Sequence, residues 1–356
     1  MIPNPWRPAS GSWRALRLGL VTTVLGLALV AVARAETVVF AGWGGSIQQA
    51  EREVYFDSFE KATGIKVIDV AGVSLAKIKA MVEANNVEWD VVQAIGMWTK
   101  PGEAAGYWEP LDYGIIDKSG VPDFLALPHA LGNSMYGQIL AYNTKGFPEG
   151  KAPKKWSDYW DTERFPGRRG MLDAPRYTME VSLLAAGTPK DKLYPLEVDK
   201  AFASLDKVKS KIDVWWKQWP QAPQLLASQE IVLTLTSHTR ILDLQQKEKA
   251  PVAFSWNDAL LTVDNLAVIK GSKNKEAAMK LVNWMNKPDL QAEFARKTAI
   301  GPANEKALSS LDDAVKQTLP TYHYGKGEMV AVNSDWWAEH LEKMEERWNT
   351  WKLSDK

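Results

Sequence analysis

An aspartate inside an otherwise apolar segment is the strongest candidate for chemistry in the sequence. Asp264 lies in the stretch LLTVDNLAVIK, which has the composition of a buried strand. A carboxylate in such a place is costly unless it meets a cation or several hydrogen-bond donors. One interpretation is a counter-charge for a ligand ammonium, and the other is an internal ion pair or a cap near a hinge. This residue alone leaves both open.

Two further segments carry side chains suited to ligand contacts. Arg240, in TSHTR, could present a bidentate fork to a carboxylate, or it could form an inter-domain or surface salt bridge. Trp43 stands in GWGGS, a turn before a helix, where exposed amides of Gly44 and Ser46 could contact a ligand and the indole could form a cleft wall. Alternatively, Trp43 packs in the core of a tight turn.

Aromatic residues are unusual here, because 17 Trp outnumber 10 Tyr and 9 Phe. Cation–π contacts and apolar stacking would suit an alkylammonium ligand. The aromatic side chains on segments expected to border a cleft are Trp98, Tyr136, Tyr177 and Trp256, with Ser237 beside them on the segment before Arg240. Other tryptophans lie on segments expected to be helical and are assigned to packing: Trp156, Trp160, Trp215, Trp216, Trp219, Trp284, Trp336, Trp337, Trp348 and Trp351.

Composition excludes several function classes. The chain of 356 residues has no cysteine, which removes disulfide scaffolds, thiol nucleophiles and Cys-ligated metals. Its 43 basic and 43 acidic residues argue against nucleic acid as a partner. The four histidines are too scattered for a metal motif, and no hydrolase or P-loop motif occurs. We therefore predict no catalytic residue, no metal and no cofactor.

The first 35 residues have the features of a cleaved secretory signal peptide. They hold four arginines and no acid, an apolar run over 18–33, and the small-x-small pattern Ala33-Arg34-Ala35. A membrane anchor is the alternative, but a span needs about 20 apolar residues. Cleavage after Ala35 would leave 39 basic and 43 acidic residues, a net charge of about −4. A cysteine-free exported protein of this size fits the bacterial periplasm.

Alternating strand and helix patterns predict an α/β protein. Strands over 37–41, 65–70 and 90–95 enclose helices over 47–63 and 75–84, as in a parallel sheet. A Pro/Gly/Lys-rich boundary over 145–155 separates a second region. The other predicted strands cover 139–143, 170–173, 231–236, 251–256 and 260–269, and the other helices cover 179–186, 273–284, 289–297 and 335–351. Five loops after strands could line one cleft: 42–46, 96–100, 173–179, 236–240 and 256–264.

The order of several segments resembles a spermidine/putrescine-type periplasmic solute-binding protein of an ABC importer. The resemblance covers residues 37–351 and is most specific in FEKATGIKV (59–67) and in NKEAAMKL (274–281). It implies a two-lobe periplasmic-binding-protein type II fold with crossover hinge strands. The implied arrangement is lobe 1 from 36–142 plus about 264–305, lobe 2 from 143–263, and a C-terminal helical segment, 306–356, packing across the lobes.

The resemblance also implies roles for individual residues. Trp43 matches the aromatic residue that lines the polyamine cleft, and Asp264 matches the acid that meets a ligand amine, which favours the functional interpretation of Asp264. A second acidic contact is expected near residues 173–177, where this chain has Tyr177, and the Trp expected after IVLTLT is replaced around Thr236 and Ser237. A long polyamine is therefore in doubt. An ω-amino acid would suit Asp264 opposite Arg240.

We therefore predict a periplasmic, non-enzymatic receptor that captures a small amine-containing solute by lobe closure. Its expected partner is an ABC permease in the inner membrane, with no nucleic acid, and the protein is expected to be a monomer. Three alternatives stay open. They are a receptor for another solute such as a sugar, an organophosphonate or iron, an exported hydrolase with two converging acids, and a structural adhesion module.

Overall fold

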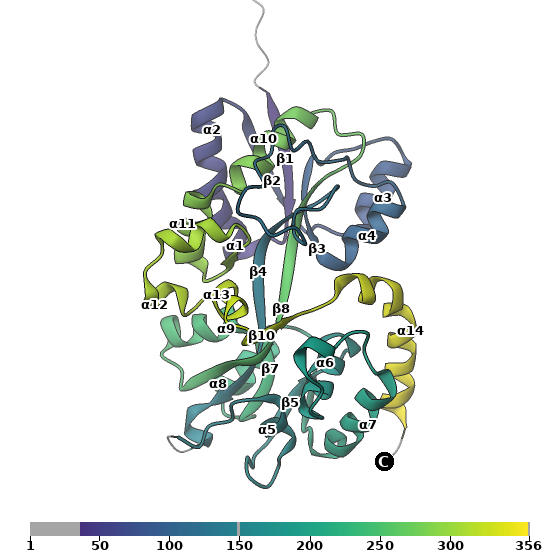
Figure 1. The fold of residues 1–356 in the computed structure, drawn as a ribbon, viewed down its shortest axis with the longest axis vertical. Helices are drawn as coiled ribbons and strands as arrows, with labels where there is room; N and C mark the ends of the chain where they lie inside the picture. Colours follow the sequence, from purple (N-terminus) through teal and green to yellow (C-terminus); the bar gives the residue numbers. More distant parts are fainter. Residues whose placement is uncertain (1–35, 148–149, 355–356) are drawn as a thin grey trace, which may run out of the picture. The chain divides into compact units, whose positions relative to one another are not determined.

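The computed structural model describes residues 36–147 and 150–354, so the predicted signal peptide over 1–35 lies outside the described residues. One mixed sheet organises this part of the chain, with the strand order β2-β1-β3-β8-β4-β7-β5-β6 (Figure 1). Two short strands pair with its long strands, β10 with β8 and β9 with β4. The predicted α/β class is confirmed. No helix in the described ranges is long and apolar enough to cross a membrane.

The three strands of the first half pair in parallel, as predicted: β1 (Thr37–Gly42), β2 (Lys66–Ala71) and β3 (Val91–Ile95). Helical turns run without a break from Gly45 to Gly64, where a glycine at φ 74° ends the helix. They comprise α1 (Gly45–Glu51), a π-helical turn (Arg52–Phe56) and α2 (Asp57–Thr63). α3 (Leu75–Glu83) begins after Ser74, whose side chain accepts a hydrogen bond from the Lys77 amide.

One predicted loop of this half is a helix. α4 (Gly96–Ala104) starts directly at the end of β3, where residues 96–100 were expected to form a loop. No loop is needed because Ile95 stays extended at φ −62° and ψ 147° while the next residue is already helical.

Two long strands run through both halves of the sheet. β4 (Leu131–Asn143) and β8 (Val252–Val268) pair antiparallel from Leu131 opposite Leu266 to Asn143 opposite Val252. The prediction of two strands separated by a loop over 256–264 is wrong. The register shifts between Gln138 and Leu140, and residues around Asp258, at φ 59°, bulge out while the pairing continues on either side.

The second half surrounds three strands: β5 (Arg169–Leu172), β6 (Val214–Trp216) and β7 (Leu233–Ser237). β5 pairs in parallel with both of the others. Trp215 and Trp216 were expected on a helix but form β6, because this short segment completes the sheet edge beside β5. The helices of this half are α5 (Trp156–Trp160), α6 (Pro175–Ala185), α7 (Val198–Val208), α8 (Gln221–Ala227) and α9 (His238–Asp243).

The C-terminal part contacts both halves. α10 (Lys275–Met285) and α11 (Pro288–Thr298) belong to the first half and match their predicted ranges closely. The last helix, α14 (Ser334–Leu353), meets α4 through the Lys100 Nζ–Glu339 Oε1 contact of 2.9 Å. Trp337 of the same helix donates to Glu180 Oε1 of α6 at 2.6 Å. Between α11 and α14 lie β9 (Gly301–Pro302), α12 (Asp313–Lys316), α13 (Pro320–Gly325) and β10 (Met329–Ala331).

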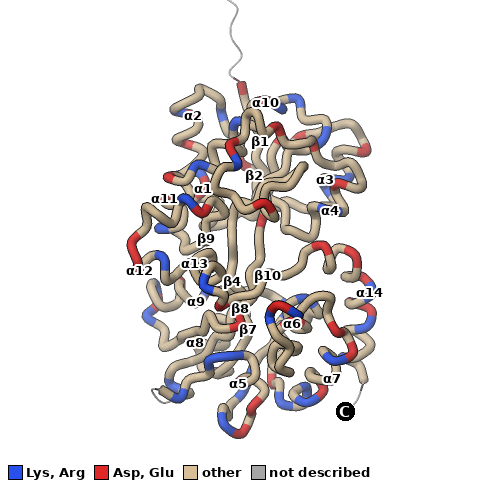
Figure 2. Tube along the Cα trace, in the orientation of Figure 1, with Lys and Arg blue, Asp and Glu red and all other residues tan. Residues whose placement is uncertain are grey.

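Many tryptophans in the described ranges are buried or half-buried, and several donate hydrogen bonds through their indole N–H groups. Trp348 donates to Asp173 Oδ1 at 3.0 Å, and Trp160 donates to the Ser204 carbonyl at 2.9 Å. Basic and acidic residues are interspersed along the trace of both halves (Figure 2), in keeping with the balanced charge of the sequence. The predicted lobe boundaries stay a prediction, since β4 and β8 pass through both halves without a break.

Candidate functional site

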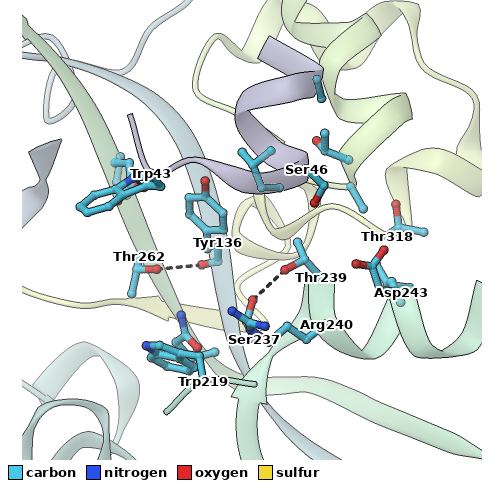
Figure 3. A pocket seen from close by; sticks show the side chains of 18 of the residues that line it. Trp43, Ser46, Tyr136, Trp219, Ser237, Thr239, Arg240, Asp243, Thr262 and Thr318 are labelled. Atoms are coloured by element: carbon cyan, nitrogen blue, oxygen red, sulfur yellow. Dashed lines mark hydrogen bonds between the residues drawn. The ribbon is translucent and has the colours of Figure 1, made fainter. Parts of the chain in front are cut away.

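A cavity of about 1020 Å³ lies where strands of both halves end. Trp43 follows β1, Gly96 follows β3, Arg176 follows β5 and Ser237 ends β7, and all four line this cavity. The carboxyl ends of strands are the usual ligand-binding edge of α/β sheets. Figure 3 shows the labelled side chains converging on this space from the two halves and from β4 and β8.

Asp264 and Trp43 form the acidic end of the cavity. Asp264 sits in the middle of β8, opposite Ile95 of β3 and Ser134 of β4. The Trp43 Nε1–H donates to Asp264 Oδ2 at 2.9 Å, and the Trp43 side chain stays 38% exposed. Among the described residues, no Lys, Arg or His lies within ion-pair distance of Asp264. The half-buried carboxylate therefore faces the cavity without a cation.

Burial sets the protonation of Asp264. It raises the pKa of Asp264 to about 7, while the Trp43 hydrogen bond and the nearby Arg176 guanidinium lower the pKa. The acid is thus poised to lose a proton near neutral pH once a cation arrives. A perturbed carboxyl in a cleft is a common feature of functional sites.

A second acid, Glu51 of α1, lies behind this pair and is fully buried. Gln93 of β3 donates to Glu51 Oε1, and Gln93 Oε1 accepts the Trp43 amide N–H at 3.4 Å. Burial, with the nearby Asp264 charge, raises the pKa of Glu51 well above its usual value. The shift favours the neutral form of Glu51, which supports the turn at Trp43 through Gln93.

The first turn of α6 carries Arg176 and Tyr177 in a kink. Tyr177 has φ 71° and ψ −41°, a conformation that is uncommon for a bulky residue and tends to occur at ligand-binding positions. The Arg176 guanidinium lies 4.4 Å from the centre of the Tyr177 ring and donates to the Tyr177 hydroxyl. Its other contact is from Nη1 to Met97 Sδ at 2.7 Å, across to the first half. Both partners of Arg176 are neutral.

Arg240 lies in the first turn of α9, directly after the end of β7. Ser237 Oγ and Thr239 Oγ1 lie 3.0 Å apart beside it and also line the cavity. Burial lowers the pKa of Arg240, opposed by the Asp243 charge, and the side chain is half-buried. Within the part of the chain that the structure describes, no hydrogen bond or ion pair engages its guanidinium. Arg240 is thus available to an anion.

His238 is turned away from this cavity. Its Nδ1 accepts from the Gly137 amide at 3.1 Å, and its Nε2 lies 2.8 Å from the Ala299 carbonyl. Burial lowers the pKa of His238 to about 4, so the ring is neutral in the physiological range. It joins α9 to the end of α11, and it has no free nitrogen for proton transfer.

The structure brings seven of the ten predicted site residues to the cavity: Trp43, Ser46, Tyr136, Tyr177, Ser237, Arg240 and Asp264. Gly44, Trp98 and Trp256 do not line it. The Gly44 amide donates to Gln48 Oε1 at 2.7 Å, and Trp98 packs behind Trp43 with ring centres 5.6 Å apart. Trp256 stacks on His323 at 4.4 Å, because the bulge in β8 turns its ring away.

Sequence reasoning missed four residues of the site. Arg176 and Glu51 were not considered, although a charged residue on the apolar face of a helix, as at Glu51, is a usable signal. Trp219 and Trp337 were assigned to packing, but both line the cavity. Their position depends on where α6, α14 and the segment after β6 meet, which no local pattern specifies.

The other acids of the cavity already have partners. Glu53 pairs with Lys297, and Asp243 pairs with Lys247 at 3.0 Å. No group of three or more His, Cys, Asp or Glu side chains in the described ranges is placed to hold a metal ion. What the arrangement offers is one unpaired carboxylate in the first half facing unpaired guanidinium groups in the second.

Residues 55–321 match the model of a family described as bacterial extracellular solute-binding proteins. A gamma-aminobutyric acid-binding protein of Pseudomonas aeruginosa is 32% identical over 92% of this chain and 95% of its own length. A spermidine/putrescine-binding periplasmic protein of Haemophilus influenzae is 28% identical over 79% of each chain. The solved structure of an ABC transporter substrate-binding protein from Bradyrhizobium japonicum aligns with a TM-score of 0.84 and 31% identity, covering 89% of this chain and 99% of that one. These similarities confirm the predicted family and its two-lobe fold.

Proposed function

The chain belongs to the bacterial extracellular solute-binding proteins and is the substrate-binding component of an ABC importer, and from this premise we propose that its solute is an ω-amino acid. The ammonium binds Asp264 beside the Trp43 ring, and the carboxylate binds Arg240 across the cavity. The relative that shares 32% identity with this chain is named for gamma-aminobutyric acid, which has this chemistry.

One observation carries the proposal: Asp264 faces the cavity with no basic side chain in ion-pair distance among the described residues. Within the described ranges, the side chain that hydrogen-bonds to it is Trp43, through Nε1. An ammonium would supply the missing charge and two or three further donors. Trp43, 38% exposed, offers an aromatic face for the alkyl chain and the cation.

Arg240 supports the choice of an amino acid over a polyamine. It lines the same cavity and is half-buried. Among the described residues no carboxylate lies within ion-pair distance of it, although the Asp243 charge acts on it from farther away, and such burial is costly unless an anion arrives. At the position where a second acid would hold a second ammonium, this chain has Tyr177 beside the Arg176 guanidinium. A terminal ammonium there would meet a positive charge, so diamines are disfavoured.

The two ends of such a ligand join the two halves of the protein. Asp264 and Trp43 belong to the first half, and Arg240 follows β7 in the second. A solute that completes its contacts only when the halves approach shifts an open–closed equilibrium toward the closed form. A differential affinity of a few kcal/mol between the two forms is enough to populate closure strongly.

The cellular setting follows the family. The protein acts in the periplasm and works with a permease. Cleavage after Ala35, a monomeric state, the absence of nucleic-acid binding and the absence of catalysis complete the proposal.

Calorimetric titration of the purified protein with 4-aminobutyrate and putrescine tests the ligand class. We expect 4-aminobutyrate to bind and putrescine to bind at least tenfold more weakly. Asp264→Asn should remove most of the affinity, because loss of a charged hydrogen-bonding partner in a desolvated site costs about 2–5 kcal/mol. Arg240→Gln should weaken 4-aminobutyrate while sparing any residual binding of putrescine.

Matched controls come from exposed residues away from the cavity. Asp123→Asn and Arg168→Gln make the same chemical changes and should leave both affinities unchanged. If Asp264→Asn binds 4-aminobutyrate with wild-type affinity, the ligand amine does not bind Asp264 and the proposal is refuted. If putrescine binds more tightly than 4-aminobutyrate, the protein is a polyamine receptor and not a receptor for an ω-amino acid.

A further inference from the structure

The charged side chains that line the cavity are unequal in sign. Five are basic and three are acidic: Arg176, Arg240, Lys247, Arg296 and Lys297 against Glu53, Asp243 and Asp264. A zwitterion such as 4-aminobutyrate brings no net charge and leaves this imbalance in place. The excess of positive charge in the cavity therefore favours a solute with a net negative charge.

The outer charges of the cavity are satisfied within the chain. Lys297 pairs with Glu53, and Lys247 pairs with Asp243 at 3.0 Å. Arg296 Nη2 donates to the Ser310 carbonyl at 2.6 Å. Arg296 is exposed, so water solvates its positive charge. The charges that a ligand could meet inside the cavity are those of Arg176, Arg240 and Asp264.

The charges of Arg176, Arg240 and Asp264 sum to one positive charge when the aspartate is ionised. Among the described residues, those that hydrogen-bond or stack with the Arg176 guanidinium are Met97 and Tyr177, and no side chain hydrogen-bonds the Arg240 guanidinium. The charges of Glu180 and Asp264 act on Arg176 from beyond ion-pair distance, and burial raises the pKa of Glu180, which favours its neutral form. Both guanidinium groups are half-buried. A guanidinium removed from water without an anion is costly, and its planar fork suits a carboxylate better than any neutral group.

The cavity also has room for a larger solute than 4-aminobutyrate. Its volume of about 1020 Å³ is at the upper end of the range for small-molecule sites, about 300–1,000 Å³. Gln138, which is 6% exposed, lines it with an Oε1 atom that has no hydrogen-bond partner. A solute with one more arm would use this space, and Gln138 Oε1 could accept a hydrogen bond from the N–H groups of the solute but not from a carboxylate.

We infer that the preferred solute is an amino dicarboxylate, with its amine at Asp264, one carboxylate at Arg240 and the second at Arg176. The inference rests on the proposed function and narrows the substrate class of the same site. Arg176 then sets specificity, since it distinguishes solutes with two carboxylates from those with one. Its contact with Met97 of the first half places the second carboxylate where the two halves meet.

Calorimetry at pH 8 with three solutes tests this inference: 4-aminobutyrate, glutamate and N-(carboxymethyl)-4-aminobutyrate. The two dicarboxylates add one carboxylate to 4-aminobutyrate at different places. We expect at least one of them to bind at least tenfold more tightly than 4-aminobutyrate. Arg176→Gln should abolish that preference, because it should weaken the preferred dicarboxylate at least tenfold more than it weakens 4-aminobutyrate.

Two further variants keep the test decisive. Arg176→Lys retains the charge without the fork and should keep a reduced preference, and Arg168→Gln, on the surface, should keep all of it. The inference falls if 4-aminobutyrate binds more tightly than both dicarboxylates. It also falls if Arg176→Gln weakens all three solutes equally, since both arginines would then share one carboxylate. In either case the proposed function stands as long as Asp264→Asn abolishes 4-aminobutyrate binding, and it fails separately if that variant binds normally.

Discussion

Solute affinity should fall as the pH is lowered through neutrality, because Asp264 must be ionised to hold an ammonium. In the unliganded protein, burial raises the pKa of Asp264 to about 7. A bound cation stabilises the carboxylate and lowers its pKa, so binding releases a proton. The unliganded carboxyl is about nine-tenths ionised at pH 8 and about one-tenth ionised at pH 6. The apparent Kd for 4-aminobutyrate should therefore rise about tenfold between these two values.

Neither the solute nor His238 titrates in the pH range of this measurement. The amine and the carboxylate of 4-aminobutyrate keep their charges from pH 6 to pH 8, since model carboxyl and amine groups titrate near 4 and 10. His238 is neutral across this range because burial lowers its pKa to about 4. Calorimetry in two buffers of different ionisation enthalpy should show release of about half a proton per ligand at pH 7.

A Kd that stays constant from pH 6 to pH 8 would refute the reasoning, as would a slope of the opposite sign. Asp264→Asn provides the internal check. Its residual binding should be independent of pH, because the titrating group is gone, and an unchanged slope in this variant would assign the proton to another residue.

Three substitutions test the surroundings of Asp264. Trp43→Phe removes the indole donor, so the midpoint of the pH dependence should move above pH 7 and the affinity at pH 7 should fall about three- to tenfold. Glu51→Gln should leave that midpoint and the affinity unchanged, because burial raises the pKa of Glu51 and favours its neutral form; a midpoint lowered by a unit would show that Glu51 is charged. Gly42→Ala places a methyl group 2.8 Å from Gln93 Oε1 and should lower the free energy of unfolding by about 1–3 kcal/mol in urea titrations. Gly325→Ala, which meets open space, is its control, and equal stabilities would contradict the crowding at residue 42.

Local patterns were enough for most of the fold. β1 to β3 and the helices between them follow from short β-branched runs and from an amphipathic helix closed by Gly64. The continuity of β8 could not be read in the same way. Its break in pattern near Asp258 is a bulge, and only pairing with β4 on both sides shows that the strand continues.

Some residues of the site could likewise be predicted from local sequence and others could not. Asp264 was identifiable because a charge inside an apolar strand is costly wherever the strand lies. Arg176 was not, because its role depends on the kink at Tyr177, which turns the first residues of α6 toward the cavity. Trp256 shows the opposite error, since it was expected at the cleft and instead stacks on His323. Side-chain direction at bulges and kinks is a tertiary property that sequence periodicity does not contain.

A crystal structure of the complex with 4-aminobutyrate is the most direct test of the account. It should place the ligand nitrogen within hydrogen-bond distance of Asp264, beside the Trp43 ring, and the ligand carboxylate on the Arg240 guanidinium. A ligand bound in the reverse direction, or one that leaves Asp264 without a contact, would contradict the central claim that this carboxylate captures the amine of the solute.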